Sequence, residues 1–206
     1  LTVKRGVVVA PRDNLASVRE EIDYFKQVST RGGEWRVPVL TTAEVRREME
    51  AGTAQVFHFS CHGNFQADDA DESRLKLEDG FLMPSAIRFD DKLALWQSAP
   101  LVFLNACHAG RVGLTVTRLG GWAECFAEAG ATAFVGTLWE INDKLAARFA
   151  REFSDRLWGL GGQTAQTVGE AFYAARMALK AEDEANPTWL AYVLYGDPNG
   201  RIVFGS

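Results

Sequence analysis

The chain has 206 residues, of which 47% are hydrophobic, and 22 Lys and Arg against 27 Asp and Glu give a formal net charge of −5. This apolar fraction is enough for one substantial core, so we expect a single domain over residues 1–206. The acidic balance argues against nucleic acid or an anionic membrane surface as the main partner, and we expect neither to be bound.

The cysteine content and the termini indicate where the protein works. No apolar run approaches the length of a membrane span, and no signal peptide opens the sequence. The three cysteines have no framework spacing, which indicates free thiols in a reducing compartment, so we expect a cytoplasmic protein. Because the chain starts at Leu1 rather than at Met, we expect a domain excised from a longer protein.

The first sixty residues alternate expected strands with expected helices. The strands are expected at residues 3–10, 36–40 and 55–60, and the helices at residues 14–28 and 42–52. Asn14 and Thr42 are the expected caps of the two helices. Val18, Ile22 and Phe25 recur at helical spacing and form an apolar stripe on the first helix. This order of elements predicts an α/β fold with a parallel sheet and right-handed crossovers.

The rest of the chain continues this alternation after an irregular middle part. The middle part is expected to hold an acidic loop at residues 64–73 and a small hairpin at residues 74–83. A broken helix at residues 84–96, a buried strand at residues 101–105 and a mobile loop at residues 111–118 are expected to follow. The last part is expected to begin with a helix at residues 119–129 and a strand at residues 132–137. Two helices at residues 142–157 and 164–182 and two strands at residues 189–195 and 201–204 are expected to follow. Asn142 is the expected N-cap of the first of these two helices.

Two of the expected strands end in residues that can carry out chemistry. Cys107 follows the strand at residues 101–105, and His62 and Gly63 follow the strand at residues 55–60. The carboxyl ends of parallel strands lie at one edge of a sheet, where ligands collect. A cysteine thiolate is a nucleophile, and an imidazole can manage the proton of a leaving amine. The pattern therefore predicts a Cys107–His62 pair, with the backbone amides of Gly63 and Cys107 as donors to an oxyanion.

Other interpretations of the same residues stay open. Cys107 can instead be a small core residue, because free cysteines are usually buried, and His62 a hydrogen-bonded loop residue. Cys61 and Cys125 are expected in the core, the first because it points away from His62 on the strand. His58 shares a face with His62 and suggests a metal site with Cys107, but zinc sites usually have close ligand pairs, so we expect no metal.

Several motifs taken together resemble the CHAT domains, which are caspase-like cysteine peptidases of the same clan as separase, legumain and the caspases. The motifs follow one another in the family's order at residues 57–63, 73–80, 101–110, 136–143, 189–192 and 195–198. The resemblance covers nearly the whole chain. It implies a caspase-like three-layer α/β/α sandwich with a mostly parallel central sheet.

The resemblance also implies an activity and the roles of single residues. It implies cleavage of a protein or peptide substrate, without metal or cofactor, by His62 as general acid/base and Cys107 as nucleophile, with the amides of Gly63 and Cys107 as oxyanion hole. The family often has threonine where Ala109 stands, and His108 is an uncommon neighbour of the nucleophile. His108 is also a poor candidate for the base, because the side chains of adjacent residues diverge.

Residues 139–143 resemble a separase segment in which an acidic residue helps to receive a basic substrate side chain. By that match Asp143 is the candidate for the primary specificity pocket, with Glu140 the weaker one, and cleavage would follow arginine or lysine. Asp143 equally fits the start of a helix, where a carboxylate interacts with the helix dipole.

Members of the family are commonly fused to helical repeats and regulated by another component, so we expect a regulatory helical-repeat domain or partner. Two alternatives to the peptidase stay open. One is a catalytically silent caspase-like module that binds a peptide in the same crevice. The other is an amidotransferase-type site, which presents its cysteine on a Gly-x-Cys-x-Gly elbow, whereas Asn105 occupies the first glycine position here.

Overall fold

A six-stranded sheet forms the centre of the computed structural model, which describes residues 1–12, 16–64, 72–87, 89–106, 113–115, 118–139 and 141–205. The strand order is β12-β11-β8-β4-β2-β3. The strands are β2 (Arg5–Val9), β3 (Glu34–Val39), β4 (Val56–Ser60), β8 (Leu101–Asn105), β11 (Ala133–Thr137) and β12 (Tyr192–Gly196). All neighbours pair in parallel except β11 and β12, which confirms the predicted mostly parallel sheet.

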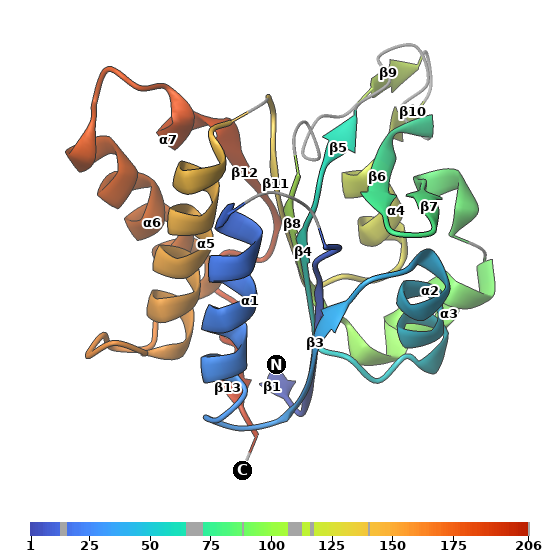
Figure 1. Cartoon of the computed structure of the whole chain (residues 1–206). Helices are drawn as coiled ribbons and strands as arrows, with labels where there is room; N and C mark the ends of the chain where they lie inside the picture. The colour runs from blue at the N-terminus through green and yellow to red at the C-terminus, as the bar shows by residue number, and fades with distance from the viewer. Residues whose placement is uncertain are drawn as a thin grey trace.

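Helices cover both faces of this sheet and complete the predicted α/β/α sandwich (Figure 1). One face carries α1 (Ala16–Val28), α5 (Asp143–Trp158) and α6 (Val168–Glu182), and the other carries α2 (Thr42–Ala51), α3 (Phe89–Ser98) and α4 (Trp122–Glu128). The short helix α7 (Thr188–Ala191) leads into β12. All strands but β12 run toward the top edge of the sheet in Figure 1, so their carboxyl ends lie together there.

In the described part of the chain, small sheets and the 3-10 turn η2 surround the central sheet. The antiparallel sheet β5-β6-β7 consists of β5 (Gly63–Asn64), β6 (Arg74–Leu77) and β7 (Gly80–Leu82), and it precedes the turn η2 (Pro84–Ala86). The pairs β1–β13 and β9–β10 consist of β1 (Thr2–Val3), β13 (Val203–Phe204), β9 (Gly113–Thr115) and β10 (Arg118–Gly120). The hairpin predicted at residues 74–83 is confirmed, and β5 extends it directly after His62.

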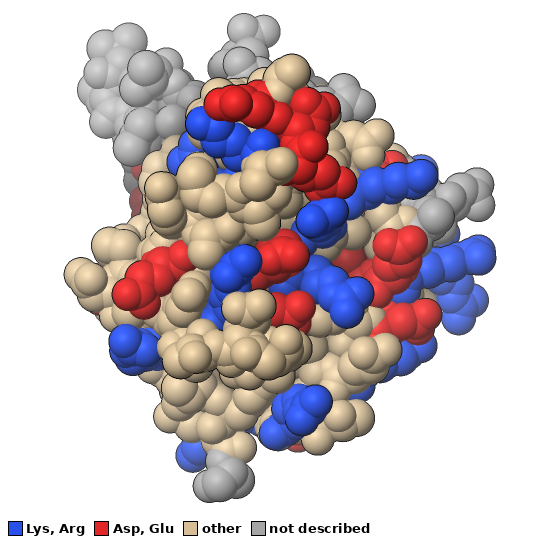
Figure 2. All heavy atoms as spheres, turned by 90° about the vertical axis from the view of Figure 1, so that its left-hand side faces the viewer, with Lys and Arg blue, Asp and Glu red and all other residues tan. Residues whose placement is uncertain are grey.

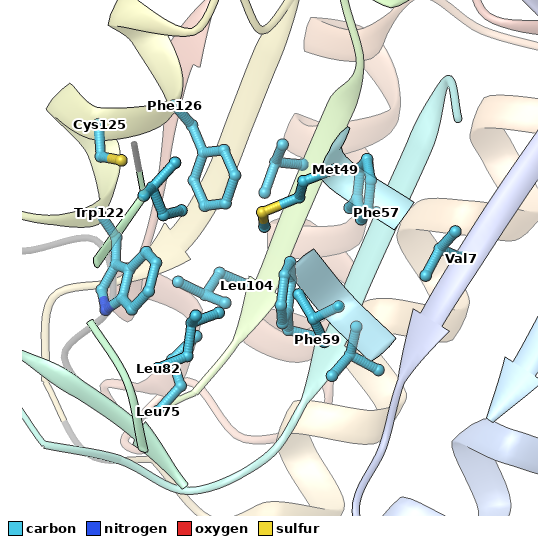
Figure 3. Close-up of a cluster of buried hydrophobic side chains, with 14 of the residues drawn as sticks. Val7, Met49, Phe57, Phe59, Leu75, Leu82, Leu104, Trp122, Cys125 and Phe126 are labelled. Atoms are coloured by element: carbon cyan, nitrogen blue, oxygen red, sulfur yellow. The ribbon is translucent and has the colours of Figure 1, made fainter. Parts of the chain in front are cut away.

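Alternation along the buried strands divides the core into two clusters. Phe57 and Phe59 of β4 face the layer of α2, α3 and α4, where they pack with Met49, Leu104 and Phe126 (Figure 3). His58 and Ser60, which alternate with Phe57 and Phe59 along β4, face the layer of α1, α5 and α6. Both faces of the central strands are therefore buried, which explains their nearly continuous apolar sequences.

The outer side of the α5–α6 layer is polar and of mixed charge. Figure 2 looks onto the side on which α6 lies, and Lys and Arg side chains are interspersed there with Asp and Glu. Arg148 of α5 pairs with Glu182 of α6 at 2.6 Å, and Lys180 pairs with Glu184 at 3.1 Å. Within the part of the chain that the structure describes, no helix combines the length and the apolar character needed to span a membrane.

Three predicted boundaries were wrong because local hydrogen bonds decide them. The second helix is capped by Thr41, not Thr42, since the Thr41 hydroxyl accepts from the Glu44 amide at 3.2 Å and Glu44 accepts from the Thr41 amide. The helix expected from residue 164 begins at residue 168, because Thr167 forms the same capping box with Glu170. The first strand, expected over residues 3–10, is interrupted at Lys4, whose amide donates to the Gln55 side chain.

Two further predictions were wrong about the kind of element. Residues 111–118, expected as a mobile loop, contain β9 and the start of β10, which pair in an antiparallel register. β10 continues through Gly120, so the helix expected from residue 119 begins only at Trp122. The strand expected at residues 189–195 starts as helix α7, and β12 begins at Tyr192. The strands β9 and β10 and the single turn of α7 are too short to show periodicity, and residues 113–120 lack a turn signal such as the Asp79-Gly80 of the predicted hairpin.

Candidate active site

The ends of β4 and β8 lie side by side at the carboxyl edge of the sheet. The two strands pair in parallel over their whole length, and their last residues, Ser60 and Asn105, are partners in the register. His62 follows Ser60 by two positions and Cys107 follows Asn105 by two positions. The structure thus places the ends of these two neighbouring strands at one edge of the sheet, and the Cys107–His62 pair stays a prediction. Cys107 itself lies outside the described residues.

The main chain around His62 is held by the small antiparallel sheet. The His62 carbonyl oxygen accepts a hydrogen bond from the Lys76 amide at 2.9 Å. Gly63 then starts β5, opposite Leu75 of β6. The His62 side chain is exposed, whereas Cys61 before it is buried against the α2–α4 layer. Strand pairing on both sides therefore fixes the backbone from which His62 projects.

A small cleft opens between the strand ends, α1 and the start of α5; we call it the strand-end cleft. Six of its lining residues matter for the site: Glu21, Ser60, His62, Asn105, Ala106 and Asp143. Its volume is about 30 Å³. The cleft thus brings the predicted base and the predicted specificity residue to one place.

Asp143 is the first residue of α5 and lies exposed at the rim of the strand-end cleft. The helix is capped by Asn142, whose side-chain oxygen accepts from the Lys144 amide at 3.0 Å, as predicted. Asp143 therefore occupies the first turn, where the helix dipole favours a carboxylate, and it also faces the cleft. Both interpretations of Asp143 are compatible with this position.

The floor of the cleft is a buried polar network that sequence reasoning missed. The Glu21 carboxylate of α1 accepts from the Ser60 hydroxyl at 3.0 Å and from the Asn105 side-chain amide at 2.9 Å. Its other oxygen contacts His58 Nε2, and the Tyr192 hydroxyl donates to Asn105 Oδ1 at 2.9 Å. A signal was available, because Glu21 falls within the apolar stripe of its helix, and a carboxylate there needs buried partners.

The competing assignments have clear structural outcomes. His58 is buried between the rings of Phe25 and Phe103, at centroid distances of 4.4 Å and 5.0 Å. Its ring nitrogen contacts a carboxylate rather than pointing toward the exposed side of the cleft. Cys61 and Cys125 are both buried in the core, as predicted. Among the described residues, no group of three or more His, Cys, Asp or Glu side chains is arranged to hold a metal ion.

Some predicted residues fall in segments that the structure does not describe. These are the cap Asn14, the nucleophile Cys107, its neighbour His108 and the second acidic candidate Glu140. Their predicted roles therefore stay predictions. The segment 64–73 is described only at its ends, at Asn64 and from Glu72 onward.

Comparison with known proteins places this arrangement in a family. A family model described as the CHAT domain matches residues 6–197. Comparison with curated proteins found no match for this chain. Among solved structures, the Arg-specific cysteine proteinase gingipain R is similar with a TM-score of 0.70 and 14% identity, covering 96% of this chain and 47% of that chain.

Two further solved structures show the same fold. The Saccharomyces cerevisiae separase–securin complex is similar with a TM-score of 0.60 and 14% identity, covering 100% of this chain and 12% of that chain. The complex of the Porphyromonas gingivalis RgpB pro- and mature domains is similar with a TM-score of 0.64 and 12% identity, covering 96% and 48%. This chain thus spans about half of the gingipain chain or less than one eighth of separase. Matched over nearly all of its length, the chain belongs to the CHAT domain family and has the fold of the caspase-like cysteine peptidases.

Proposed function

We propose that this CHAT domain is a cysteine endopeptidase that cleaves a protein or peptide substrate with Cys107 and His62. The observation that carries the proposal is the register of β4 and β8, in which Ser60 lies beside Asn105. The two strands therefore end at the same height, and His62 and Cys107 each follow a strand end by two positions in the sequence. The family match and the fold of solved cysteine proteinases support the same activity.

Strand alternation supports a common orientation for the two reactive side chains. His58 and Ser60 of β4, and Phe103 and Asn105 of β8, all contact the α1–α5–α6 side of the sheet. Side chains alternate with a period of two along a strand, and His62 and Cys107 each follow a residue of this face by two positions in the sequence, so we propose that they share it. The exposed His62 at the strand-end cleft agrees with this orientation.

The proposed reaction uses only groups of this chain and water. The Cys107 thiolate attacks the carbonyl carbon of the scissile peptide bond, and a carbon–sulfur bond forms while the carbonyl oxygen becomes negative. The backbone amides of Gly63 and Cys107 donate hydrogen bonds to that oxygen. The intermediate collapses with cleavage of the carbon–nitrogen bond, and His62 gives the leaving amine the proton that it took from the Cys107 thiol. Water then attacks the thioester, which releases the carboxylic acid and restores the thiol.

Substrate preference is assigned to the acidic rim of the cleft. We place Asp143 in the primary specificity pocket, where its carboxylate would pair with an arginine or lysine before the scissile bond. Glu140 is a second, weaker candidate. Asp143 and His62 both line the strand-end cleft, which supports this assignment.

Regulation by another domain or protein is part of the proposal, and a helical-repeat component is the regulator that we propose. Two of the solved structures of this fold are complexes, one of separase with securin and one of a mature proteinase with its pro-domain. We also propose that the domain works within a longer protein in the cytoplasm. The three cysteines of the sequence have no framework spacing, which supports a reducing compartment.

Labelling with peptide electrophiles tests the proposal. The protein, carrying its natural flanking sequence, is treated with three probes that end in arginine, aspartate or leucine. We expect covalent labelling that depends on the terminal residue, is lost in Cys107→Ala and is kept in Cys125→Ala, which changes a buried cysteine of α4. Labelling by none of the probes contradicts the peptidase and favours the silent peptide-binding module.

A second variant tests the specificity assignment separately. Asp143→Asn removes the charge but keeps the size of the side chain. We expect the rate with the arginine probe to fall about 10- to 100-fold, the range for losing a charge-assisted hydrogen bond, while the leucine probe changes less than about 3-fold. An unchanged ranking of the probes would exclude Asp143 from the specificity pocket and leave the nucleophile assignment intact.

A further inference from the structure

Glu21 connects the two strand ends through a single buried carboxylate. It lies on α1, is 4% exposed, and reaches the carboxyl edge of the sheet. One of its oxygens accepts both from Ser60 of β4 and from Asn105 of β8, at 3.0 Å and 2.9 Å. The same atom therefore holds the last residue of each strand.

The partners of Glu21 are themselves fixed by further contacts. The Asn105 side chain is held at both ends, because its amide donates to Glu21 and its oxygen accepts from the Tyr192 hydroxyl of β12. The His58 ring is enclosed between two aromatic rings while its Nε2 contacts the second Glu21 oxygen. A fully satisfied polar network of this kind is rigid and defines one arrangement of the elements that it joins.

A carboxylate at this position is not needed for packing. The helix stripe around it is formed by Val18, Ile22 and Phe25, where an apolar side chain of similar size would pack without the cost of burying a charge. The network instead has a special location, since Ser60 and Asn105 each precede a proposed reactive residue by two positions. Two residues of chain span no more than about 7 Å, so the hydrogen bonds of Glu21 act close to both proposed reactive residues.

We propose that Glu21 is the positioning residue that sets the ends of β4 and β8 relative to each other, and with them His62 and Cys107. Its catalytic consequence rests on the peptidase function proposed above. A catalytic pair must be held within about 0.5 Å of its productive geometry by such supporting contacts. A displacement of about 1 Å costs on the order of 100-fold in rate, so the hold on the strand ends matters for activity as well as for folding.

The test compares Glu21→Gln with Glu48→Gln, a matched substitution at another buried carboxylate. Glu48 is 3% exposed, lies on α2 on the opposite face of the sheet, and binds Arg5 and Arg36 instead of the strand ends. In Glu21→Gln an amide nitrogen replaces one carboxylate oxygen, so either the oxygen shared by Ser60 and Asn105 or the oxygen that contacts His58 is lost. The remaining hydrogen bonds are no longer charge-assisted. Both variants are measured for global stability, for amide hydrogen exchange, and for the labelling rate with the peptide probes.

We expect Glu21→Gln to speed exchange at residues 60–63 and 105–106 about 5- to 100-fold beyond its effect on global stability, the range for a lost buried hydrogen bond. The maximal labelling rate should fall about 10- to 100-fold, and the half-saturating probe concentration should change less than about 3-fold. Glu48→Gln should lower global stability without a local effect at either strand end and without a change in the maximal labelling rate.

If Glu21→Gln does not fold, Tyr192→Phe disturbs the same network from β12. It should then speed exchange at residues 105–106 more than at residues 60–63, because Tyr192 contacts Asn105 directly. Equal exchange at the strand ends in the two Glu→Gln variants overturns the inference, whatever happens to labelling. Faster exchange in Glu21→Gln with no labelling of the unmodified protein supports the positioning role and rejects the peptidase function.

Discussion

The hydroxyl of Tyr192 offers a sharp test of the buried network. Tyr192 is 1% exposed, its ring stacks on Phe149 at a centroid distance of 3.6 Å, and its hydroxyl donates to Asn105 Oδ1 at 2.9 Å. Tyr192→Phe keeps the stacked ring and removes only the donor. The buried Asn105 oxygen then loses this partner, which costs about 1–3 kcal/mol of unfolding free energy. For a domain of this size that is a fall in melting temperature of roughly 2–12 °C.

Tyr195 of the same strand provides the matched control. Its side chain is 36% exposed, and partial burial raises the pKa of its hydroxyl. Water can replace the hydroxyl's interactions at this surface, so Tyr195→Phe should change stability by less than about 0.5 kcal/mol. Urea unfolding of both variants gives the comparison, provided that the slope with denaturant is unchanged. A Tyr192→Phe protein as stable as the Tyr195→Phe protein would refute the energetic importance of the Asn105 contact.

Two further predictions concern the helix α2. Hydrogen bonds from the Leu40 amide and from Thr41 lower the pKa of the Glu44 carboxyl below its ordinary value of 4.5. The contribution of Glu44 to stability is therefore present above pH 4.5 and is lost as the pH falls through the lowered pKa. Glu44→Gln should therefore weaken the loss of stability on acidification below about pH 4.5, measured by unfolding at a series of pH values, and an unchanged pH dependence would contradict this. Gly52→Ala should destabilise the protein by more than Gly162→Ala, although both glycines have positive φ. An added Cβ at Gly52 would lie 2.5 Å from a backbone oxygen of α3, whereas an added Cβ at Gly162 would meet nothing within 4 Å. Equal losses in thermal unfolding would show that only the backbone conformation matters.

Strand positions were predictable because burial on both faces leaves a continuous apolar run. The strand at residues 101–105 is found as predicted, and the α/β order that follows from such runs gave the layers correctly. The N-cap at Asn142 was also predictable, because a cap is a contact between near neighbours. One boundary error arose because the chain offers two neighbouring cap candidates, Thr41 and Thr42, and only the partner Glu44 decides between them.

The candidate site divides in the same way. His62 and Asp143 could be selected from their motifs, and the structure places both at the strand-end cleft. Glu21 stands in the apolar stripe of α1, yet its sequence neighbourhood does not say which donors it meets. One of them, Asn105, is 84 positions away. No local pattern announces a contact of that separation.

The amino-acid sequence alone thus determined the order of strands and helices, the family resemblance and the residues with reactive side chains. These properties depend on periodicity and on motifs within a few residues. Only the tertiary structure decided that β4 and β8 are neighbours in register, and that Glu21, His58, Asn105 and Tyr192 form one network beneath the cleft. The physical reason is that a buried carboxylate is satisfied by whichever donors the packed sheet and helices bring within hydrogen-bonding distance, and that choice is made by the whole fold.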